Sequence, residues 1–420
     1  MKLGIEIGFL VTPQLSDPSS PRQGEWPPAP DRIFQALVAT AAETGQDMQV
    51  LAHLESAPEV QASNAQRPLA PTGYVPANFK KNKRYHPNTA RHLPVVLPEN
   101  PVVTYVWDNV PEDVVPAISS IVERVTHIGR ASSLVRSTIK DGNAVRTNWI
   151  PNEVGHKFMR APYPGRLNDL QTTFGAGLRS HPAPAYGYLS TTEKIISTPW
   201  GDLMVLKTCQ QLDLTSATKW AGNLRRAMMS VAADDIPSLI HGHDNHRHVA
   251  WAAIPDVGHK YASGNILGLG CWLPADITTE EKGYIGSLLI RVSNLNGVRL
   301  QIDSVGLKGL RATTWSRASR KWATVTPIAL DRWPKRNKRP EQIITDSLVA
   351  MGLPVPSKIS CSNYSPVRGA ANPRKYPARN GNRFITHAEI EWDKLVAGPL
   401  LIGADRYFAG GLCLAMDRRN

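Results

Sequence analysis

Strand-like segments alternate with amphipathic helical segments along both halves of the chain, and this alternation limits the fold more than any other feature. In the first half, the apolar, β-branched run LGIEIGFLV (3–11) predicts a strand, and a proline-rich stretch then leads into a helix that begins near Pro30. A strand at 101–108, a helix over 111–129 and a basic return segment at 127–137 follow. Strand, helix, strand, helix, strand in this order is typical of a ferredoxin-like unit.

The second half repeats the alternation. Strands are predicted at 248–255, 265–274, 297–306, 321–330, 359–366 and 383–392, and helices at 278–295 and 339–352. The domain boundary is expected near residue 235, after a helix at 215–232. Residues 150–198 are rich in proline and glycine, which predicts loops and short hairpins. The expected fold is α+β, with two tandem ferredoxin-like modules at 1–235 and 236–420.

The charge balance points to a polyanionic partner. The 420 residues carry 48 Lys+Arg against 35 Asp+Glu, a net charge of +13, and nucleic acid is the commonest partner of such a chain. The alternative is a basic protein whose charge only keeps it in solution. No apolar run is long enough to span a membrane, and the N-terminus does not resemble a signal peptide, so a cytoplasmic protein is expected.

Five of the twelve histidines lie between residues 241 and 259. Four of them, His241, His243, His246 and His248, lie beside Asp244. Two or three of these could chelate zinc, but neither a cysteine nor a distant carboxylate is identified that would complete the set. The four cysteines of the chain are far apart and are expected to be reduced core residues. The prediction is therefore no metal and no cofactor, with a zinc protein as an alternative.

The fifth histidine, His259, lies in a short polar loop between two strand-like runs, beside Lys260 and Tyr261. Histidine exchanges protons near neutral pH, and a cation or hydroxyl beside it can stabilise developing charge. These residue types suffice for metal-independent RNA cleavage, in which a ribose 2′-OH attacks the adjacent phosphate and leaves a 2′,3′-cyclic phosphate and a 5′-OH. Asp256 and Asp303 look isolated, which disfavours a two-metal nuclease.

Three basic or glycine-rich segments, residues 80–92, 127–137 and 398–416, are candidates for RNA binding. Cations surround an aromatic ring in KKNKRYHPNTARH, which suits a loop that follows phosphates and stacks a base. Glycines flank a charged and aromatic centre in GPLLIGADRYFAGGLCLAM, where the backbone could approach phosphates. The predicted RNA-binding residues are Lys80, Lys81, Lys83, Arg84, Arg130, Arg136, Gly403, Arg406, Tyr407, Gly410 and Gly411.

Several of these segments together resemble the type I-G (formerly I-U) CRISPR-associated RAMP proteins, the GSU0054/Csb2-like family. The resemblance rests on EWPPAPDRIFQALVATAA (25–42), HIGRASSLV (127–135), the run from His241 through IPDVGHKYASGNILGLG, KWATVTPIALDR (321–332) and GPLLIGADRYFAGGL (398–412). It implies two RAMP modules, a crRNA 5′-handle-binding subunit fused to a repeat-cleaving endoribonuclease. The expected partners are precursor and mature CRISPR RNA, the backbone and large subunits of a type I Cascade effector and, indirectly, target DNA.

The resemblance also assigns roles to single residues. A histidine close to the first strand of the module is the usual catalytic group, which places His259 first and His243 in reserve. The family's glycine-rich loop corresponds to residues 403–411, although Ala404 and Ala409 stand where further glycines or polar residues are usual. Because several proteins of this kind bind RNA without cutting it, a non-catalytic handle-binding subunit is the alternative.

Overall fold

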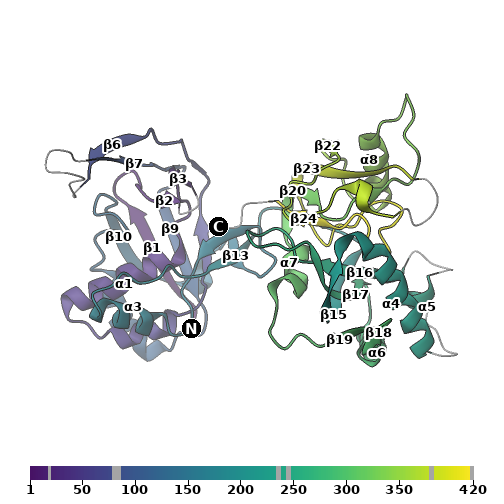
Figure 1. The fold of residues 1–420 in the computed structure, drawn as a ribbon. Helices are drawn as coiled ribbons and strands as arrows, with labels where there is room; N and C mark the ends of the chain where they lie inside the picture. The colour runs from purple at the N-terminus through teal and green to yellow at the C-terminus, as the bar shows by residue number, and fades with distance from the viewer. Residues whose placement is uncertain (18–19, 78–86, 233–237, 243–246, 378–382, 417–420) are drawn as a thin grey trace. The chain divides into compact units, whose positions relative to one another are not determined.

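The chain forms two compact units that divide between Thr192 and Glu193. The computed structural model describes residues 1–17, 20–77, 87–232, 238–242, 247–377 and 383–416 (Figure 1). The sequence had placed the boundary near residue 235. The structure places it earlier because the strand and helix that precede residue 235 pack into the second unit.

The first unit is built on an antiparallel sheet, and two helices pack against this sheet to form the core. Its central elements are β1 (Leu3–Phe9), α1 (Pro30–Thr44), β4 (Glu59–Ala62), β9 (Val102–Trp107), α2 (Val115–Val122) and β10 (Val135–Asp141). The strands lie in the order β10-β1-β9-β4, and each neighbouring pair is antiparallel. This order and the βαββαβ connectivity are those of the ferredoxin-like motif. The sequence predicted such a unit here but did not predict its second strand, β4.

Alternating side chains of β1 create the core of this unit. Leu3, Ile5 and Ile7 are buried and pack in one cluster with Phe34 of α1 and Ile118 of α2. Apolar side chains recur every two residues along the strand and about every 3.6 residues along the helices, so each element buries one apolar face.

The first unit continues beyond this motif. Strands β11 (Trp149–Pro151), β13 (Ala185–Ser190) and β12 (Lys157–Arg160) extend the sheet from β4, and α3 (Arg166–Gly175) lies within the segment predicted to be loops and hairpins. The prediction missed α3 because its anchor is a tertiary contact. The buried Arg166 side chain makes two hydrogen bonds of 2.9 Å with the carboxylate of Asp31 in α1.

The second unit contains another sheet of the same connectivity. Its elements are β15 (Trp200–Asp213), α4 (Ala217–Ala232), β16 (Ala250–Pro255), β17 (Asn265–Pro274), α6 (Thr279–Arg291), β18 (Asn294–Leu295) and β19 (Val298–Gln301). The strand order is β16-β17-β15-β19-β18, again antiparallel throughout. A capping box between Thr278 and Glu281 starts α6.

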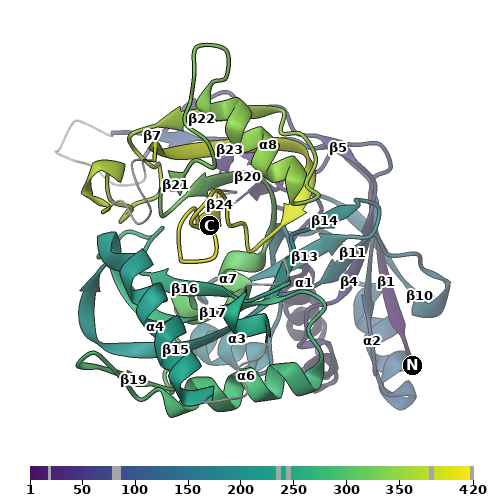
Figure 2. The same ribbon diagram turned by 90° about the vertical axis from the view of Figure 1, so that its right-hand side faces the viewer.

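A third sheet completes the second unit. It contains β14 (Ile195–Ser197), β20 (Ala318–Thr324), β21 (Ile328–Ala329), β22 (Lys358–Ser362), β23 (Ile385–Ala397) and β24 (Cys413–Ala415), with α8 (Pro340–Ala350) beside β22 and β23 (Figure 2). The order β22-β23-β20-β24 repeats that of the other two sheets. The glycine-rich segment 398–412 replaces the second helix. The described chain therefore contains three sheets of this order, where the sequence predicted two modules.

Short elements connect these sheets. They are β2 (Ser16–Asp17), β3 (Ser20–Gly24), η1 (Met48–Leu54), β5 (Ala65–Gln66), β6 (Gly73–Pro76), β7 (Asn88–Arg91), β8 (Leu97–Pro98), η2 (Glu112–Val114), η3 (Gly142–Ala144), η4 (Leu214–Ser216), α5 (Ser238–His241), η5 (Lys308–Leu310), α7 (Ala312–Ser316) and η6 (Pro373–Lys375). Two of the four cysteines, Cys271 and Cys413, are buried as predicted, whereas Cys209 is exposed because it lies on the outward side of β15.

Candidate functional site

The loop between β16 and β17 holds His259 against a carboxylate. The His259 Nε2 atom lies 2.6 Å from Asp256 Oδ1, and the Tyr261 amide donates a hydrogen bond of 3.3 Å to His259 Nδ1. Because an amide only donates, Nδ1 is the acceptor nitrogen, and in the neutral ring Nε2 carries the proton and donates to Asp256. The sequence had treated Asp256 as isolated, and the structure shows that this was wrong.

Asp256 is itself held in place. Its Oδ2 atom accepts hydrogen bonds of 2.9 Å from the Ser263 amide and 2.7 Å from the Ser263 hydroxyl. Burial acts to raise the pKa of Asp256, but the hydrogen bonds from Ser263 and His259 outweigh it, so this pKa lies below its usual range. Asp256 is therefore ionised at neutral pH and orients the imidazole. The three-residue spacing between Asp256 and His259 was the signal in the sequence that could have revealed this pair.

The predicted catalytic residues lie together in this loop and are open to solvent. The His259 side chain is 52% exposed and Tyr261 is 80% exposed. The Lys260 Nζ atom lies 5.4 Å from the centre of the Tyr261 ring. The resemblance had placed His259 after the first strand of its module. In the structure the first strand is β15, and His259 follows the second strand, because β15 and α4 belong to the same sheet as β16.

A second loop, residues 367–371, supports the His259 loop from the third sheet. The Gly258 amide donates to the Arg368 carbonyl at 2.9 Å, and a Cβ atom on Gly264 would lie 2.6 Å from the Gly369 carbonyl oxygen. The two backbones therefore approach closely only because glycines stand there.

The buried His387 fixes the second loop to β23, and the sequence did not single it out. Its Nε2 atom lies 2.9 Å from the Ala371 carbonyl oxygen, and its Nδ1 atom lies 2.8 Å from Thr324 Oγ1. Burial lowers the pKa of His387, with its two hydrogen bonds opposing the shift. His387 is therefore a neutral structural residue at physiological pH.

The glycine-rich loop does not present its glycines to solvent. Gly403, Gly410 and Gly411 are buried, and the amides of Gly410 and Gly411 donate to the carbonyls of Asp405 and Pro327, both at 3.0 Å. Gly411 has a φ of 61°, and a Cβ atom there would lie 1.9 Å from the Ile402 carbonyl oxygen. These glycines let the loop fold tightly upon itself, so the expected approach of their backbone to phosphate finds no support in this geometry.

Arg406 and Tyr407 are the predicted residues of this loop that remain partly exposed. Arg406 donates to the Gly403 carbonyl at 3.0 Å, and its guanidinium lies 5.0 Å from the centre of the Tyr407 ring. The Tyr407 ring also lies 3.9 Å from the ring of His248, centre to centre. The structure thus brings a residue of the histidine-rich stretch to the glycine-rich loop.

The loop that holds His259 and the glycine-rich loop lie at opposite ends of β16. The Trp251 amide donates to the Tyr407 carbonyl at 3.0 Å, whereas Asp256 follows the other end of the strand. At about 3.3 Å per residue, the five steps along the chain from Trp251 to Asp256 span roughly 16 Å. His259 and Tyr407 therefore do not form one compact site.

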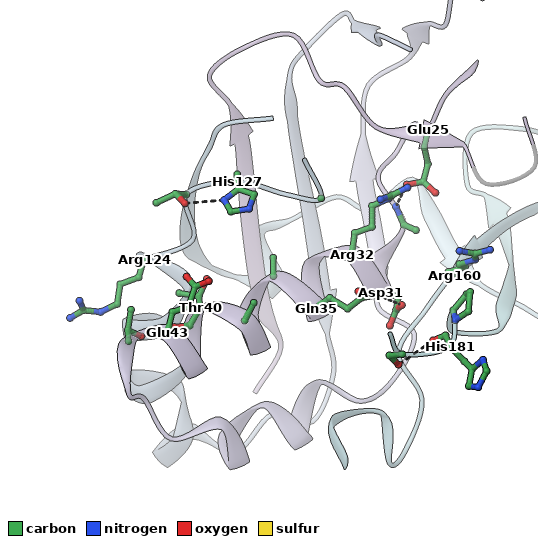
Figure 3. Close-up of a pocket in the computed structure, with 18 residues that line it drawn as sticks. Glu25, Asp31, Arg32, Gln35, Thr40, Glu43, Arg124, His127, Arg160 and His181 are labelled. Atoms are coloured by element: carbon green, nitrogen blue, oxygen red, sulfur yellow. Dashed lines mark hydrogen bonds and ion pairs between the residues drawn. The ribbon is translucent and has the colours of Figure 1, made fainter. Parts of the chain in front are cut away.

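The first unit contains a cavity of about 600 Å³ along α1, which the sequence did not predict (Figure 3). Its lining includes Arg124, His127, Arg160 and His181. Neither Arg124 nor Arg160 has an ion pair among the residues that the structure describes. Burial raises the pKa of the lining Glu25 despite its ion pair with Arg32.

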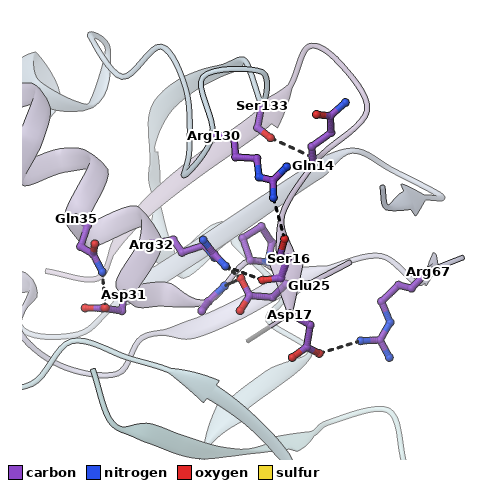
Figure 4. A network of polar contacts seen from close by, with 12 residues as sticks. Gln14, Ser16, Asp17, Glu25, Asp31, Arg32, Gln35, Arg67, Arg130 and Ser133 are labelled. Carbon is purple, nitrogen blue, oxygen red and sulfur yellow. Dashed lines mark hydrogen bonds and ion pairs between the residues drawn. The ribbon is translucent and has the colours of Figure 1, made fainter. Parts of the chain in front are cut away.

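The two predicted cations of the 127–137 segment differ in their contacts. The Arg130 guanidinium donates to the Ser16 hydroxyl at 3.3 Å and the His92 carbonyl at 3.2 Å, beside the Glu25–Arg32 pair (Figure 4). Arg136 is exposed on β10. The remaining predicted residues, Lys80, Lys81, Lys83, Arg84 and His243, lie outside the described residues.

Metal-binding clusters and membrane-spanning helices are both absent from the described residues. No group of three or more His, Cys, Asp or Glu side chains that could hold a metal ion occurs in this part of the chain. No helix within the same residues combines the length and apolar character that crossing a membrane requires.

Comparison with known proteins identifies the family. The family model described as "CRISPR-associated protein, GSU0054 family" matches residues 2–415, which is nearly the whole chain and includes every candidate site described above. The chain belongs to this CRISPR-associated family.

Solved structures with partial similarity to this family member also come from CRISPR systems. One is the crystal structure of a CRISPR protein from Archaeoglobus fulgidus, with 15% identity, a TM-score of 0.21 and coverage of 36% of this chain and 68% of that chain. Another is a Cas6 product complex, with 12% identity, a TM-score of 0.31 and coverage of 51% of this chain and 99% of that chain. No curated protein sequence matches the chain.

Proposed function

We propose that this protein is an endoribonuclease that cleaves precursor CRISPR RNA within the repeat, with His259 as the general base and Asp256 as its positioning residue. The observation that carries the proposal is the Asp256–His259 pair at 2.6 Å on a solvent-exposed loop. Membership of a CRISPR-associated family and the net charge of +13 support RNA as the substrate.

The arrangement of hydrogen bonds suits proton abstraction. Asp256 holds Nε2–H, so the lone pair of Nδ1 carries only the long contact of 3.3 Å from the Tyr261 amide. Nδ1 would take the proton of a ribose 2′-OH, and the 2′ oxygen would attack the adjacent phosphorus. The bond to the 5′ oxygen then breaks, and that oxygen takes a proton from solvent. The products are a 2′,3′-cyclic phosphate and a 5′-OH.

Lys260 and Tyr261 would stabilise the charge on the phosphate. Both neighbour His259 in the loop, and the ammonium of Lys260 lies against the ring of Tyr261. A cation and a hydroxyl beside the reacting phosphate lower the barrier because they interact with charge that builds in the transition state. This mechanism uses side chains of the chain alone.

In the wider proposal, the protein stays bound to its product as a subunit of a type I-G Cascade effector. The first unit would bind the crRNA 5′ handle and the second would process the repeat. Arg136, Arg406, Tyr407 and the basic residues between 80 and 84 are the proposed RNA contacts, because the described ones are exposed or partly exposed. Exposed cations bind phosphates with an affinity that falls as salt rises.

The alternative is a crRNA-handle-binding subunit that does not cleave. The separation of His259 from the glycine-rich loop by the length of β16 favours this reading, since the two predicted parts of the site do not meet.

Incubation with the repeat RNA of its own CRISPR array in EDTA, followed by mapping of the product ends, tests the proposal. Cleavage at one position with a 2′,3′-cyclic phosphate on the upstream fragment is the expected result. Tight binding of the repeat with no product over hours would overturn the endoribonuclease proposal in favour of the non-catalytic binding subunit. Cleavage that requires added metal would overturn the mechanism.

A further inference from the structure

A basic hairpin, residues 331–339, connects β21 to α8 in the second unit, and the proposed cleavage mechanism does not use it. Hydrogen bonds in both directions between Lys335 and Lys338, at 3.0 and 3.1 Å, close the hairpin around a two-residue turn. Five cations stand in this segment against one carboxylate, that of Asp331, which gives a local net charge of +4.

Most of these cations are not neutralised by the protein. The carboxylate of Asp331 lies 3.6 Å from the guanidinium of Arg406, and Lys338 forms an ion pair with Asp346 of α8. The other four cations are exposed and have no ion pair within the described parts of the chain: Arg332, Lys335, Arg336 and Arg339. Exposed cations gathered in this way attract a polyanion.

An exposed indole stands among these cations. Trp333 is 53% exposed, whereas all the other tryptophans of the chain are buried or half-buried. Its ring meets the ring of Phe384 at right angles, with 6.1 Å between the ring centres. A single T-shaped contact covers at most one face of a ring, so Trp333 has a face open to solvent.

The backbone on both sides of Trp333 is fixed. The Leu330 amide donates to the Phe384 carbonyl at 3.0 Å, and the Arg383 guanidinium donates to the Leu330 carbonyl at 3.0 Å. Pro334 fixes its own φ directly after the tryptophan. Because the main chain is already ordered, a ligand that stacks on this ring has little backbone freedom to remove.

Proteins bind single-stranded nucleic acid with cations that follow the phosphates and aromatic rings that stack on the bases. We propose that the basic hairpin binds a single-stranded segment of RNA, with one unpaired base stacked on Trp333 and phosphates against the four exposed cations. The inference rests on the proposed RNA-binding function and adds a surface outside the cleavage loop. The contact between Asp331 and Arg406 makes this surface continuous with an RNA contact already proposed.

Binding of an unstructured RNA oligonucleotide to the full-length protein, measured by fluorescence anisotropy at several salt concentrations, tests the proposal. Trp333→Ala should weaken binding about 5- to 150-fold at every salt concentration, the range of one base–aromatic stack. The double variant Lys335→Gln/Arg336→Gln should instead lower the salt dependence. The slope of log K against log salt should become shallower by about 1.4, since each phosphate contact with a single strand contributes about 0.7.

Matched controls separate this surface from general effects of charge and folding. Trp333→Phe keeps an aromatic face and should bind much more tightly than Trp333→Ala. Arg291→Gln/Arg299→Gln makes the same change in net charge at exposed positions of α6 and β19, and it should leave the slope unchanged. In both views α6 lies on the side of this unit away from α8 (Figures 1 and 2).

A duplex of the same length tests whether an unpaired base is needed. Trp333→Ala should bind the duplex as the wild type does, because paired bases are already stacked on their neighbours. The urea midpoint of each variant checks that it is folded.

The outcomes distinguish this inference from the proposed function. A wild-type protein that binds neither the oligonucleotide nor its intact repeat overturns both. Cleavage of the repeat by the wild type, with oligonucleotide binding unchanged in both hairpin variants, overturns this surface alone. Binding that depends on the hairpin, with no cleavage of the repeat, overturns the endoribonuclease and leaves the surface. An equal loss of slope in Arg291→Gln/Arg299→Gln, or an equal loss on the duplex in Trp333→Ala, would also overturn the surface.

Discussion

The substitution His259→Ala separates cleavage from RNA binding. It removes the imidazole whose Nδ1 is the proposed base and leaves Lys260 and Tyr261 in place. General-base catalysis contributes about 10²- to 10⁴-fold to rate constants, or roughly 2.7 to 5.5 kcal/mol of barrier. A single-turnover cleavage rate in EDTA should therefore fall by about that factor.

The same substitution should leave folding and binding nearly unchanged. The side chain is 52% exposed, and Asp256 keeps both hydrogen bonds from Ser263 when the imidazole is removed. The loss of a solvent-screened pair of this kind costs about 1 kcal/mol or less. Affinity for the repeat should stay within about 3-fold, since less than 1 kcal/mol is involved. The exposed His53 of η1 provides a matched control, and His53→Ala should cleave normally.

Two results would refute this reasoning. Cleavage by His259→Ala within about 3-fold of the wild type would remove His259 from the mechanism, because general-base catalysis requires a far larger loss. Asp256→Asn should also slow cleavage, since it changes the partner of Nε2, and the double variant should be no slower than His259→Ala. Additive losses would mean that Asp256 does not act through His259.

Two further predictions concern stability. Gly411→Ala should destabilise the second unit by about 2 kcal/mol or more, because the new side chain meets both a left-handed backbone conformation and a steric clash. Gly283→Ala, on an exposed face of α6 with open space around it, should instead stabilise the unit by about 0.5–1 kcal/mol. Equal urea midpoints for the two variants would contradict this. The folded state holds the pKa of His387 below its ordinary value of 6.5, so the unfolded chain binds a proton at this histidine first as the pH falls. The free energy of unfolding should therefore fall as the pH drops below 6.5 and level off below the folded-state pKa. Urea melts from pH 7.5 down to 5 measure this slope, which His387→Gln should reduce; an unchanged slope would exclude His387 as its source.

Local sequence patterns predicted most of the elements. The strand-like runs 3–11, 101–108 and 265–274 correspond to β1, β9 and β17, and the helices predicted from Pro30 and at 278–295 correspond to α1 and α6. These patterns are local because a strand or helix must bury one face, and the period of its apolar residues follows from backbone geometry. Membership of a CRISPR-associated family was predicted for the same reason, since it rests on motifs that are contiguous in the chain.

Only the tertiary structure decided how these elements combine. The module count changed from two to three because strand order depends on contacts between distant segments, such as β15 with β17 and β20 with β24. α3 was missed because the ion pair between Arg166 and Asp31 joins residues far apart in sequence.

The candidate site shows the same division between what local sequence predicted and what the tertiary structure decided. The sequence placed a histidine in a polar loop between two strands, and the loop is where it predicted. That Asp256 turns back to hold His259, and that His248 reaches Tyr407 while His259 does not, follows from hairpin geometry and sheet packing. Such contacts depend on three-dimensional distance, which the spacing of residues along a chain determines only within a single turn or hairpin.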